Sequence, residues 1–264
     1  MLGAVIGDIV GSIFEFSPTK AKDFPFFQSG CRFTDDTVMS AAVASACLEY
    51  LSSGRDYEIF SKTVTAKMRE LGRRHPRAGY GGMFAQWLIS DDMPPYNSFG
   101  NGSAMRVSPV AWVAQSLTEA LKLAELSALP THNHPDGVKG AQAAGACVYL
   151  ARSGSSKDEI RKYVTDNFYP LDFTIDAIRP GYSFDVTCSG SVPQAIESFL
   201  ESSDYEDAVR TAVSLGGDSD TIGAITGGIA EAFYGVPEDI KKAALEYLPD
   251  DIIEVYNKFC AAIG

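Results

Sequence analysis

The sequence is short of basic residues relative to acidic ones, and this shortage excludes some classes of partner. Its 264 residues include 22 Lys and Arg but 34 Asp and Glu, so the formal net charge is −12 and the pI is about 4.7. A surface with this charge repels phosphate backbones and anionic lipid headgroups. We therefore expect no nucleic-acid binding through a broad basic face and no membrane partner. A small anionic substrate is compatible with this charge only if bound cations neutralise its site locally.

The chain also lacks a C-x-x-C cysteine pair and an evident internal linker, and no targeting segment is expected. Its five cysteines are an odd number and lie far apart, which is typical of reduced thiols and predicts a cytoplasmic protein. The apolar segment 1–16 lacks a basic start, carries Asp8 and Glu15 and is too short to span a bilayer, so neither a signal peptide nor an anchor is expected. Because no Pro/Gly/Ser-rich stretch divides the chain, we predict a single domain, residues 1–264, of unspecified oligomeric state.

Strand-like alternation is rare in the sequence, whereas helical periodicity is frequent. The one extended candidate, Tyr182–Cys188, does not make a sheet by itself. A hydrophobic content of 45% is enough for a large core. The fold class predicted is therefore all-α, as a compact multi-helix domain. The clearest helical runs are Val38–Leu51, Tyr57–Leu71, Leu117–Leu126, Val138–Arg152, Lys157–Asn167, Pro193–Leu200 and Tyr205–Leu215.

Two further apolar segments carry glycines at helical spacing. Glycines 3, 7 and 11 recur every four residues, and the segment Ile222–Tyr234 contains Gly223, Gly227 and Gly228. Each glycine costs about 1 kcal/mol of helix propensity relative to alanine. Helices that retain such glycines are expected to pack closely against a neighbouring backbone.

Two acidic tetrads, Thr34-Asp35-Asp36-Thr37 and Asp218-Ser219-Asp220-Thr221, each open an apolar helix. Either tetrad alone is more often an N-cap than a ligand set, because Asp and Thr oxygens accept the free N–H groups of a first helical turn. Capping, however, uses one oxygen at one position, and crowded carboxylates repel one another unless cations lie between them. Oxygen ligands of this kind favour Mg²⁺ or Mn²⁺, whereas zinc would prefer His or Cys.

Asp8 and Glu15 could add to this acidic cluster. They lie seven residues apart, which is two helical turns, so both side chains are expected to leave the same face as Ser12, next to the row of glycines. For Asp8, a packing role and a role in the site are equally open. Glu15 lies where the helix is expected to give way to a loop, which is a better place from which to reach a ligand.

Two glycine-rich loops and one histidine are candidates for binding a substrate. The loop 100–106 precedes an apolar helix, so its N–H groups are suited to an anion, although it lacks the G-K-[ST] ending of a P-loop and the strand that precedes a dinucleotide fingerprint. The loop 79–83 is equally well explained as a plain turn. His132 and His134 have no metal-binding partner in sequence, and His132 is the better candidate for contacting a substrate.

In combination, these motifs resemble those of the ADP-ribosylglycohydrolase family. The resemblance covers nearly the whole chain and rests on the order and spacing of Gly7-Asp8-x-x-Gly11-x-x-x-Glu15, Thr34-Asp35-Asp36-Thr37, Gly79-Tyr80-Gly81, Gly100-Asn101-Gly102-Ser103-Ala104-Met105-Arg106, Thr131-His132 and Gly216-Gly217-Asp218-Ser219-Asp220-Thr221. It implies an all-helical fold with a binuclear Mg²⁺ or Mn²⁺ centre at the base of a cleft that takes ADP-ribose.

The same resemblance implies a role for individual residues. Glu15 is expected to approach the metal centre either as a ligand through water or as an acid/base group, and Glu15 and Asp35 are the candidates for handling protons. The implied ligands of the two cations are Thr34, Asp35, Asp36, Asp218, Asp220 and Thr221. The implied substrate contacts are Tyr80, Gly81, Asn101, Gly102, Ser103, Met105, Arg106 and His132.

The activity implied is hydrolysis of the glycosidic bond at the distal ribose of an ADP-ribosylated protein or a small-molecule ADP-ribose conjugate. An arginine linkage is the first choice, and serine, O-acetyl and nucleobase linkages are alternatives. Two other functions use the same features. A catalytically silent ADP-ribose binder would have lost metal ligands, and all six are present here. A metal-dependent phosphohydrolase would release AMP instead of intact ADP-ribose.

Overall fold

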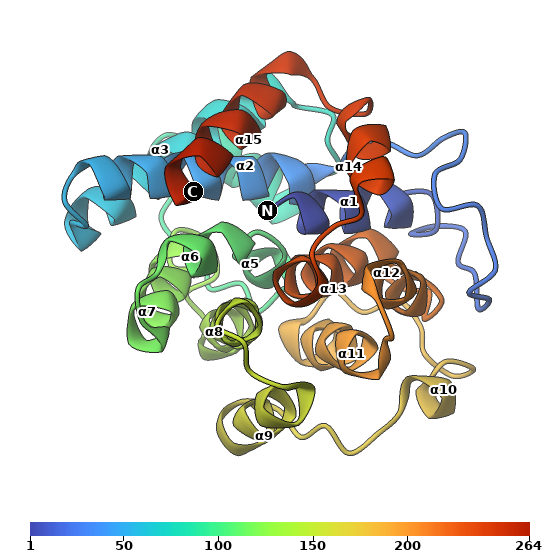
Figure 1. Cartoon of the computed structure of the whole chain (residues 1–264). Coiled ribbons are helices and arrows are strands. Elements are labelled where there is room, and N and C mark those ends of the chain that lie inside the picture. Colours follow the sequence, from blue (N-terminus) through green and yellow to red (C-terminus); the bar gives the residue numbers. More distant parts are fainter.

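The computed structural model describes residues 1–264 and confirms the all-α prediction (Figure 1). It contains no sheet, and the extended segment around Tyr182–Cys188 forms only one isolated bridge, between Gly100 and Thr187. No helix combines the length and the apolar character needed to cross a membrane. The fifteen helices are α1 (Leu2–Gly11), α2 (Asp35–Ser52), α3 (Tyr57–Arg74), α4 (Gly82–Ile89), α5 (Gly102–Met105), α6 (Ser108–Val113), α7 (Leu117–Ala128), α8 (Pro135–Arg152), α9 (Lys157–Asn167), α10 (Ile175–Ile178), α11 (Cys188–Glu201), α12 (Tyr205–Val213), α13 (Ser219–Tyr234), α14 (Glu238–Leu245) and α15 (Asp250–Ile263).

Every predicted helical run overlaps a helix, but several helices begin earlier than predicted, and α12 ends at Val213, two residues before the predicted end at Leu215. Helix α11 begins at Cys188 instead of Pro193, because Thr187 caps its first turn by accepting the Gly190 N–H. Pro193 is then tolerated inside the helix. Helices α14 and α15, which follow Gly235, were not among the runs singled out from the sequence.

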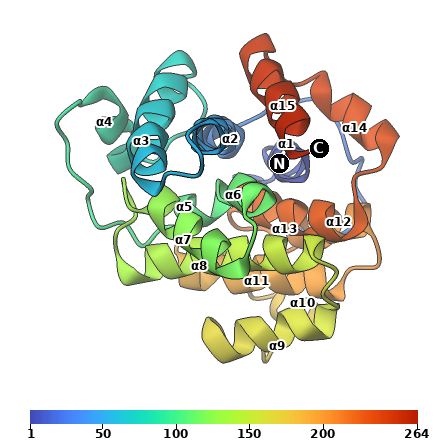
Figure 2. The ribbon, with the colours of Figure 1, turned by 60° about the vertical axis from the view of Figure 1, so that its left-hand side comes forward.

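The helices surround one connected core of 68 buried apolar residues. In Figures 1 and 2, α2 lies beside α3 and α15 on one side of the molecule, and α8, α11, α12 and α13 form the other side. Helix α9 lies at the outer edge. Helix α1 runs between the two sides and is buried along its whole length.

Helices α1 and α13 pack antiparallel with their backbones almost in contact, as the glycine spacing predicted. A Cβ atom on Gly3 would lie 2.3 Å from the carbonyl oxygen of Gly227, and one on Gly7 would lie 1.9 Å from that of Gly223. Glu231 of α13 also accepts the free N–H groups of Leu2 (3.1 Å) and Gly3 (2.9 Å) at the start of α1. This pairing brings the end of α1 next to the beginning of α13.

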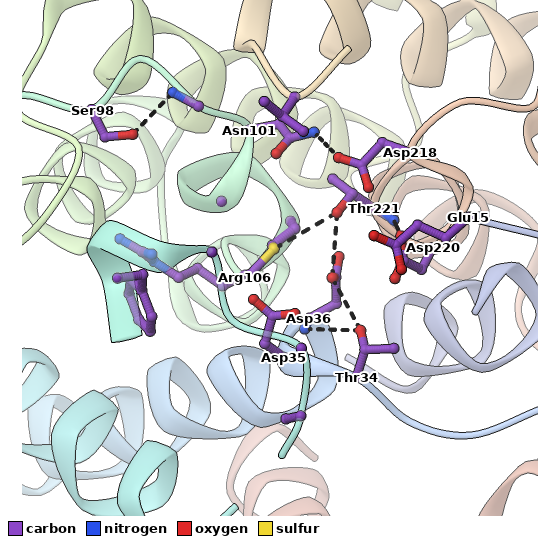
Figure 3. A pocket seen from close by; sticks show the side chains of 18 of the residues that line it. Glu15, Thr34, Asp35, Asp36, Ser98, Asn101, Arg106, Asp218, Asp220 and Thr221 are labelled. Atoms are coloured by element: carbon purple, nitrogen blue, oxygen red, sulfur yellow. Dashed lines mark hydrogen bonds between the residues drawn. The ribbon is translucent and has the colours of Figure 1, made fainter. Parts of the chain in front are cut away.

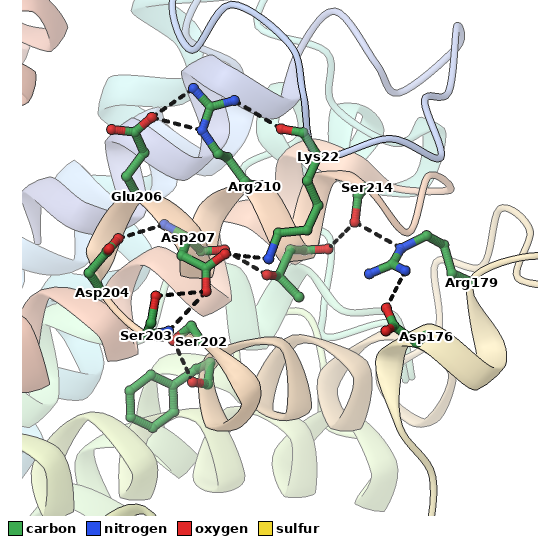
Figure 4. Close-up of polar contacts among 12 residues, drawn as sticks. Lys22, Asp176, Arg179, Ser202, Ser203, Asp204, Glu206, Asp207, Arg210 and Ser214 are labelled. Atoms are coloured by element: carbon green, nitrogen blue, oxygen red, sulfur yellow. Dashed lines mark hydrogen bonds and ion pairs between the residues drawn. The ribbon is translucent and has the colours of Figure 1, made fainter.

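The long connection between α1 and α2 is held against α12 by basic side chains (Figure 4). Arg210 donates to the carbonyl oxygens of Lys22 (3.0 Å) and Phe24 (2.6 Å), and Lys22 forms an ion pair with Asp207. Lys20 donates to the carbonyl oxygens of Tyr182 (2.7 Å) and Leu215. The connection therefore returns the chain to the start of α2 beside the end of α1.

Because the α1–α13 contact leaves no room for a methyl group, Gly7→Ala should destabilise the fold. We expect the free energy of unfolding to fall by about 2 kcal/mol or more, since overpacking against a rigid backbone outweighs the gain of about 1 kcal/mol in helix propensity. Urea denaturation measures this difference. The control is Gly181→Ala, because a Cβ there meets nothing within 4 Å. Equal stability of the two variants would contradict the close packing.

Candidate metal centre and active site

A cavity of about 500 Å³ opens beside the starts of α2 and α13, and most of the predicted site residues line it (Figure 3). Tyr80 and Ser103 are not in its lining. Tyr80 instead stacks on Phe84 at 5.5 Å between ring centroids, and the Ser103 hydroxyl donates to the Gly137 carbonyl oxygen (2.6 Å). The predicted residues that do line the cavity are Glu15, Thr34, Asp35, Asp36, Gly81, Asn101, Gly102, Met105, Arg106, His132, Asp218, Asp220 and Thr221.

The two acidic tetrads, far apart in sequence, meet at the base of this cavity. The Thr221 hydroxyl donates to Asp36 Oδ2 (3.3 Å) and so joins the start of α13 to the start of α2. Capping explains little of this arrangement. Thr34 caps α2 by accepting the Asp36 N–H (3.4 Å), but the residue before α13, Asp218, makes no capping hydrogen bond. The carboxylates therefore converge for a reason other than ending the helices.

Asp8 and Glu15 reach the cluster from different elements, not from one helical face. Helix α1 ends at Gly11, so Glu15 lies on the turn that follows the helix, and the expectation of a shared face is wrong. Glu15 is half-buried, and one of its oxygens lies within 4.8 Å of carboxylate oxygens of Asp218 and Asp220. Asp8 is fully buried and is grouped in the same way with Asp36 and Asp220, although it does not line the cavity.

Burial raises the pKa of every carboxyl group in this cluster, and repulsion between the carboxylates adds to the rise at all of them except Asp220. Burial, followed by the charge of Asp220, raises the pKa of Asp8 to about 7, that of Glu15 to about 7 and that of Asp35 to about 8. The pKa values of Asp36 and Asp218 are raised well above their usual range for the same two reasons. The Arg32 guanidinium only partly offsets this effect at Glu15.

The cluster fits divalent cations by its donor chemistry. Asp36 Oδ1 is buried and has no hydrogen-bond partner, which is costly for a carboxylate oxygen unless it faces a cation. The surrounding donors are carboxylate and hydroxyl oxygens, which suit Mg²⁺ or Mn²⁺ better than zinc. The residues that could hold such ions are the predicted set, Thr34, Asp35, Asp36, Asp218, Asp220 and Thr221.

Asn101 connects the loop 100–106 to the acidic cluster. Its side-chain Nδ2 donates to Asp218 Oδ2 (2.6 Å), and its backbone N–H donates to the Val186 carbonyl oxygen (2.8 Å). The backbone N–H and one of the two side-chain N–H groups are therefore already used within the protein, and one side-chain N–H is left. From the sequence, Asn101 was predicted to contact the substrate. No local sequence pattern indicates its contact with Asp218, which lies 117 residues further along the chain.

Arg106 lies beneath the loop, with its guanidinium directed away from the carboxylates (Figure 3). Its Nη2 donates to the Ser127 carbonyl oxygen and to Thr131 Oγ1, both at 2.9 Å, and burial lowers its pKa to about 10. The Thr131 hydroxyl in turn lies 2.7 Å from His132 Nδ1. Burial, together with the nearby Arg106 charge, lowers the pKa of His132, so its imidazole is neutral. Arg106 thus supports His132 through Thr131.

The sequence model of the ADP-ribosylglycohydrolase family matches residues 1–263. The chain therefore belongs to this family and is a glycohydrolase enzyme, which confirms the resemblance drawn from the motifs.

Individual relatives extend this similarity over most of the chain. ADP-ribosylarginine hydrolase Tri1 of Pseudomonas putida (strain GB-1) is 27% identical, over 92% of this chain and 73% of the relative. ADP-ribosylhydrolase ARH3 of Homo sapiens is also 27% identical, over 96% of this chain and 90% of the relative. A solved structure described as an ADP-ribosylglycohydrolase-related protein complex has a TM-score of 0.63 and 22% identity, over 99% of this chain and 93% of that one. This last likeness shows a shared fold.

The raised pKa values predict how the stability of the metal-free protein depends on pH. Asp8, Glu15 and Asp35 have ordinary pKa values of 3.8, 4.5 and 3.8, and in the folded protein these rise to about 7, 7 and 8. Between about pH 4 and pH 8 the unfolded chain has therefore released protons that the folded protein retains, so the free energy of unfolding falls as pH rises. EDTA-treated protein should melt at a higher temperature at pH 5.5 than at pH 8.0 in scanning calorimetry.

Asp36→Asn should make this pH dependence shallower, because it removes one charge from the crowded cluster and relieves repulsion. The same replacement at the exposed residue Asp92 is the control and should leave the dependence unchanged. A melting temperature of the EDTA-treated wild type that rises between pH 5.5 and pH 8.0 would show that the pKa values of these carboxyl groups are not raised in the folded protein.

Proposed function

We propose that this enzyme is a metal-dependent hydrolase that cleaves the glycosidic bond at the distal ribose of an ADP-ribosyl conjugate and releases ADP-ribose. The observation that carries the proposal is the convergence of both acidic tetrads at the base of one cavity, with Asp36 Oδ1 left without a protein partner. An ADP-ribosylated protein is the proposed partner, and small-molecule conjugates are chemically equivalent alternatives. The arginine linkage is our first choice, supported by the similarity to an ADP-ribosylarginine hydrolase.

Two divalent cations, Mg²⁺ or Mn²⁺, are the proposed cofactors. They would be held by the two tetrads, through Thr34, Asp35, Asp36, Asp218, Asp220 and Thr221. When bound, such cations polarise the oxygen atoms that coordinate to them and neutralise the surrounding carboxylates.

Glu15 and Asp35 are the proposed proton-handling residues. Their pKa values of about 7 and about 8 in the absence of cations allow either group to hold a proton near neutral pH. Both side chains line the cavity, Glu15 from the turn after α1 and Asp35 from the first turn of α2. Cleavage of a glycosidic bond passes through a transition state with positive charge on the sugar ring, which nearby carboxylates stabilise.

The loop 100–106 and His132 are proposed to hold the nucleotide part of the substrate. Asn101, Gly102, Met105, Arg106 and His132 line the same cavity as the carboxylates. His132 lies against Gly102, where a Cβ atom would be 3.1 Å from His132 Nε2. The glycine therefore leaves room beside a neutral imidazole, which is able to donate or accept a hydrogen bond.

A panel of defined conjugates tests the reaction. ADP-ribosyl-arginine, ADP-ribosyl-serine and O-acetyl-ADP-ribose are incubated with the enzyme and Mg²⁺ or Mn²⁺, and the products are separated by chromatography. We expect intact ADP-ribose, released fastest from the arginine conjugate. Asp218→Asn is the matched control and should remain folded but lose most activity. Release of AMP would identify a phosphohydrolase, and no turnover of any conjugate would identify a silent binder.

Chelation should weaken substrate binding as well as chemistry. Five carboxyl groups, Glu15, Asp35, Asp36, Asp218 and Asp220, line the cavity, and two unit charges 4 Å apart interact by about 4 kcal/mol at an effective dielectric of 20. Protonation relieves part of this repulsion in the metal-free protein, so a partial loss is expected. Calorimetric titration with ADP-ribose should show affinity lower by about tenfold or more after EDTA treatment. Equal affinities before and after EDTA treatment would show that cations in the acidic cluster do not contribute to binding of ADP-ribose.

A further inference from the structure

The Asp8 carboxylate has an unusually complete set of hydrogen bonds for a residue outside the cavity. Its Oδ2 accepts from the backbone N–H groups of Thr34 (2.9 Å) and Thr37 (3.1 Å) and from the Thr37 hydroxyl. Its Oδ1 accepts from the Thr34 hydroxyl (2.6 Å). All four donors come from the two threonines that flank Asp35 and Asp36.

The hydroxyl of Thr34 has one proton and two lone pairs, so the direction of its proton decides what its oxygen can bind. Two carboxylates compete for this proton. Asp8 Oδ1 lies at 2.6 Å, whereas Asp36 Oδ2 lies at 3.3 Å. A hydrogen bond from a hydroxyl to a carboxylate is strongest near the shorter of these distances. The Thr34 hydroxyl therefore donates to Asp8 Oδ1. One of its lone pairs accepts the Asp36 N–H (3.4 Å), and the other is left to face the cavity.

Asp8 is also held rigidly in place by its neighbours in α1. Gly7 and Gly11 pack against the backbone of α13, where added Cβ atoms would lie 1.9 Å from the Gly223 carbonyl oxygen and 2.3 Å from that of Ser219. The side chain of Asp8 is completely buried. Its carboxylate therefore holds the first turn of α2 in place, because Thr34 and Thr37 both donate hydrogen bonds to it.

We propose that Asp8 is a positioning residue, which accepts the hydrogen bond of the Thr34 hydroxyl and fixes the first turn of α2 so that a lone pair of the Thr34 oxygen is left to bind a cation. This inference rests on the metal centre of the proposed function. The alternative is that Asp8 binds a cation directly, since one of its oxygens is grouped with those of Asp36 and Asp220. Three donors already occupy Oδ2, and Asp8 does not line the cavity.

The replacement Asp8→Asn tests the role of the proton directly. If the amide oxygen takes the place of Oδ2, the amide nitrogen takes the place of Oδ1 and donates to Thr34 Oγ1. The hydroxyl proton of Thr34 must then turn toward Asp36, where it opposes a cation. Calorimetric titration of the substrate-free protein with Mn²⁺ should show affinity lower by about 10- to 100-fold, the usual effect of losing a partner that orients a ligand.

A double-mutant cycle separates this effect from a simple loss of charge. In a Thr34→Val background, Asp8→Asn should reduce Mn²⁺ affinity by at least about tenfold less than it does in the wild type, because the hydroxyl through which Asp8 acts is absent. Thr37→Val removes another hydroxyl donor to Asp8 and is the matched control, because Thr37 does not line the cavity. It should leave Mn²⁺ affinity within about threefold of wild type. Equal effects of Asp8→Asn in both backgrounds would overturn the proposal in favour of charge or direct binding.

A measurement on the wild type keeps the proposal testable if Asp8→Asn does not fold. Neutron diffraction from crystals of the deuterated protein should place the deuterium of the Thr34 hydroxyl toward Asp8 Oδ1, and a deuterium directed at Asp36 would overturn the proposal. Titration of the wild-type protein with Mn²⁺ tests the metal centre separately from the role of Asp8. No binding to wild type would refute the metal centre itself. Equal binding by wild type and Asp8→Asn would refute only the role of Asp8.

Discussion

The close contact between α1 and α13 is the constraint on which the rest of the site depends. Because the helices run antiparallel with glycines at their interface, the end of α1 lies against the start of α13. Asp8 and Asp220 are therefore brought together by backbone packing and not by attraction, since both are acidic. Asp8 then binds Thr34 and Thr37 and so places the start of α2 at the same point. One helix pair thereby sets the position of both acidic tetrads.

The core opposes the repulsion that this arrangement creates. Buried carboxylates without counterions raise one another's pKa values, and each raised value means that the ionised group destabilises the folded state near neutral pH. Around them lies a connected core of 68 buried apolar residues, whose burial supplies the favourable free energy. Functional sites are where proteins most often break the rules of stable design. In the acidic cluster, several carboxylates are buried together without counterions, and the cations of the proposed metal centre would supply the missing positive charge.

The sequence predicted the parts of this structure that depend on local pattern. Glycine spacing predicted the backbone contact, the tetrads predicted an acidic cluster, and helical periodicity predicted the fold class. Contacts between segments that are distant in sequence could not be predicted in this way, because no local pattern indicates them. The role of Asp8 depends on the connection from Ser12 to Phe33, which returns the chain to α1 through contacts with α12. Glu15 was placed on the same helical face as Asp8 because the helical spacing was extended beyond Gly11, where α1 ends.

The contact between Asn101 and Asp218 shows why the two ends of the cavity belong to one site. Asn101 donates one side-chain N–H to a carboxylate of the acidic cluster at 2.6 Å and its backbone N–H to the Val186 carbonyl oxygen. This bond ties the loop 100–106 to the start of α13. A shift of either element would therefore disturb the other. The distance between the loop 100–106 and the carboxylates is thus set by the protein itself. Under the proposed function, this is the preorganisation that hydrolysis of a bond at a fixed distance from a diphosphate would require.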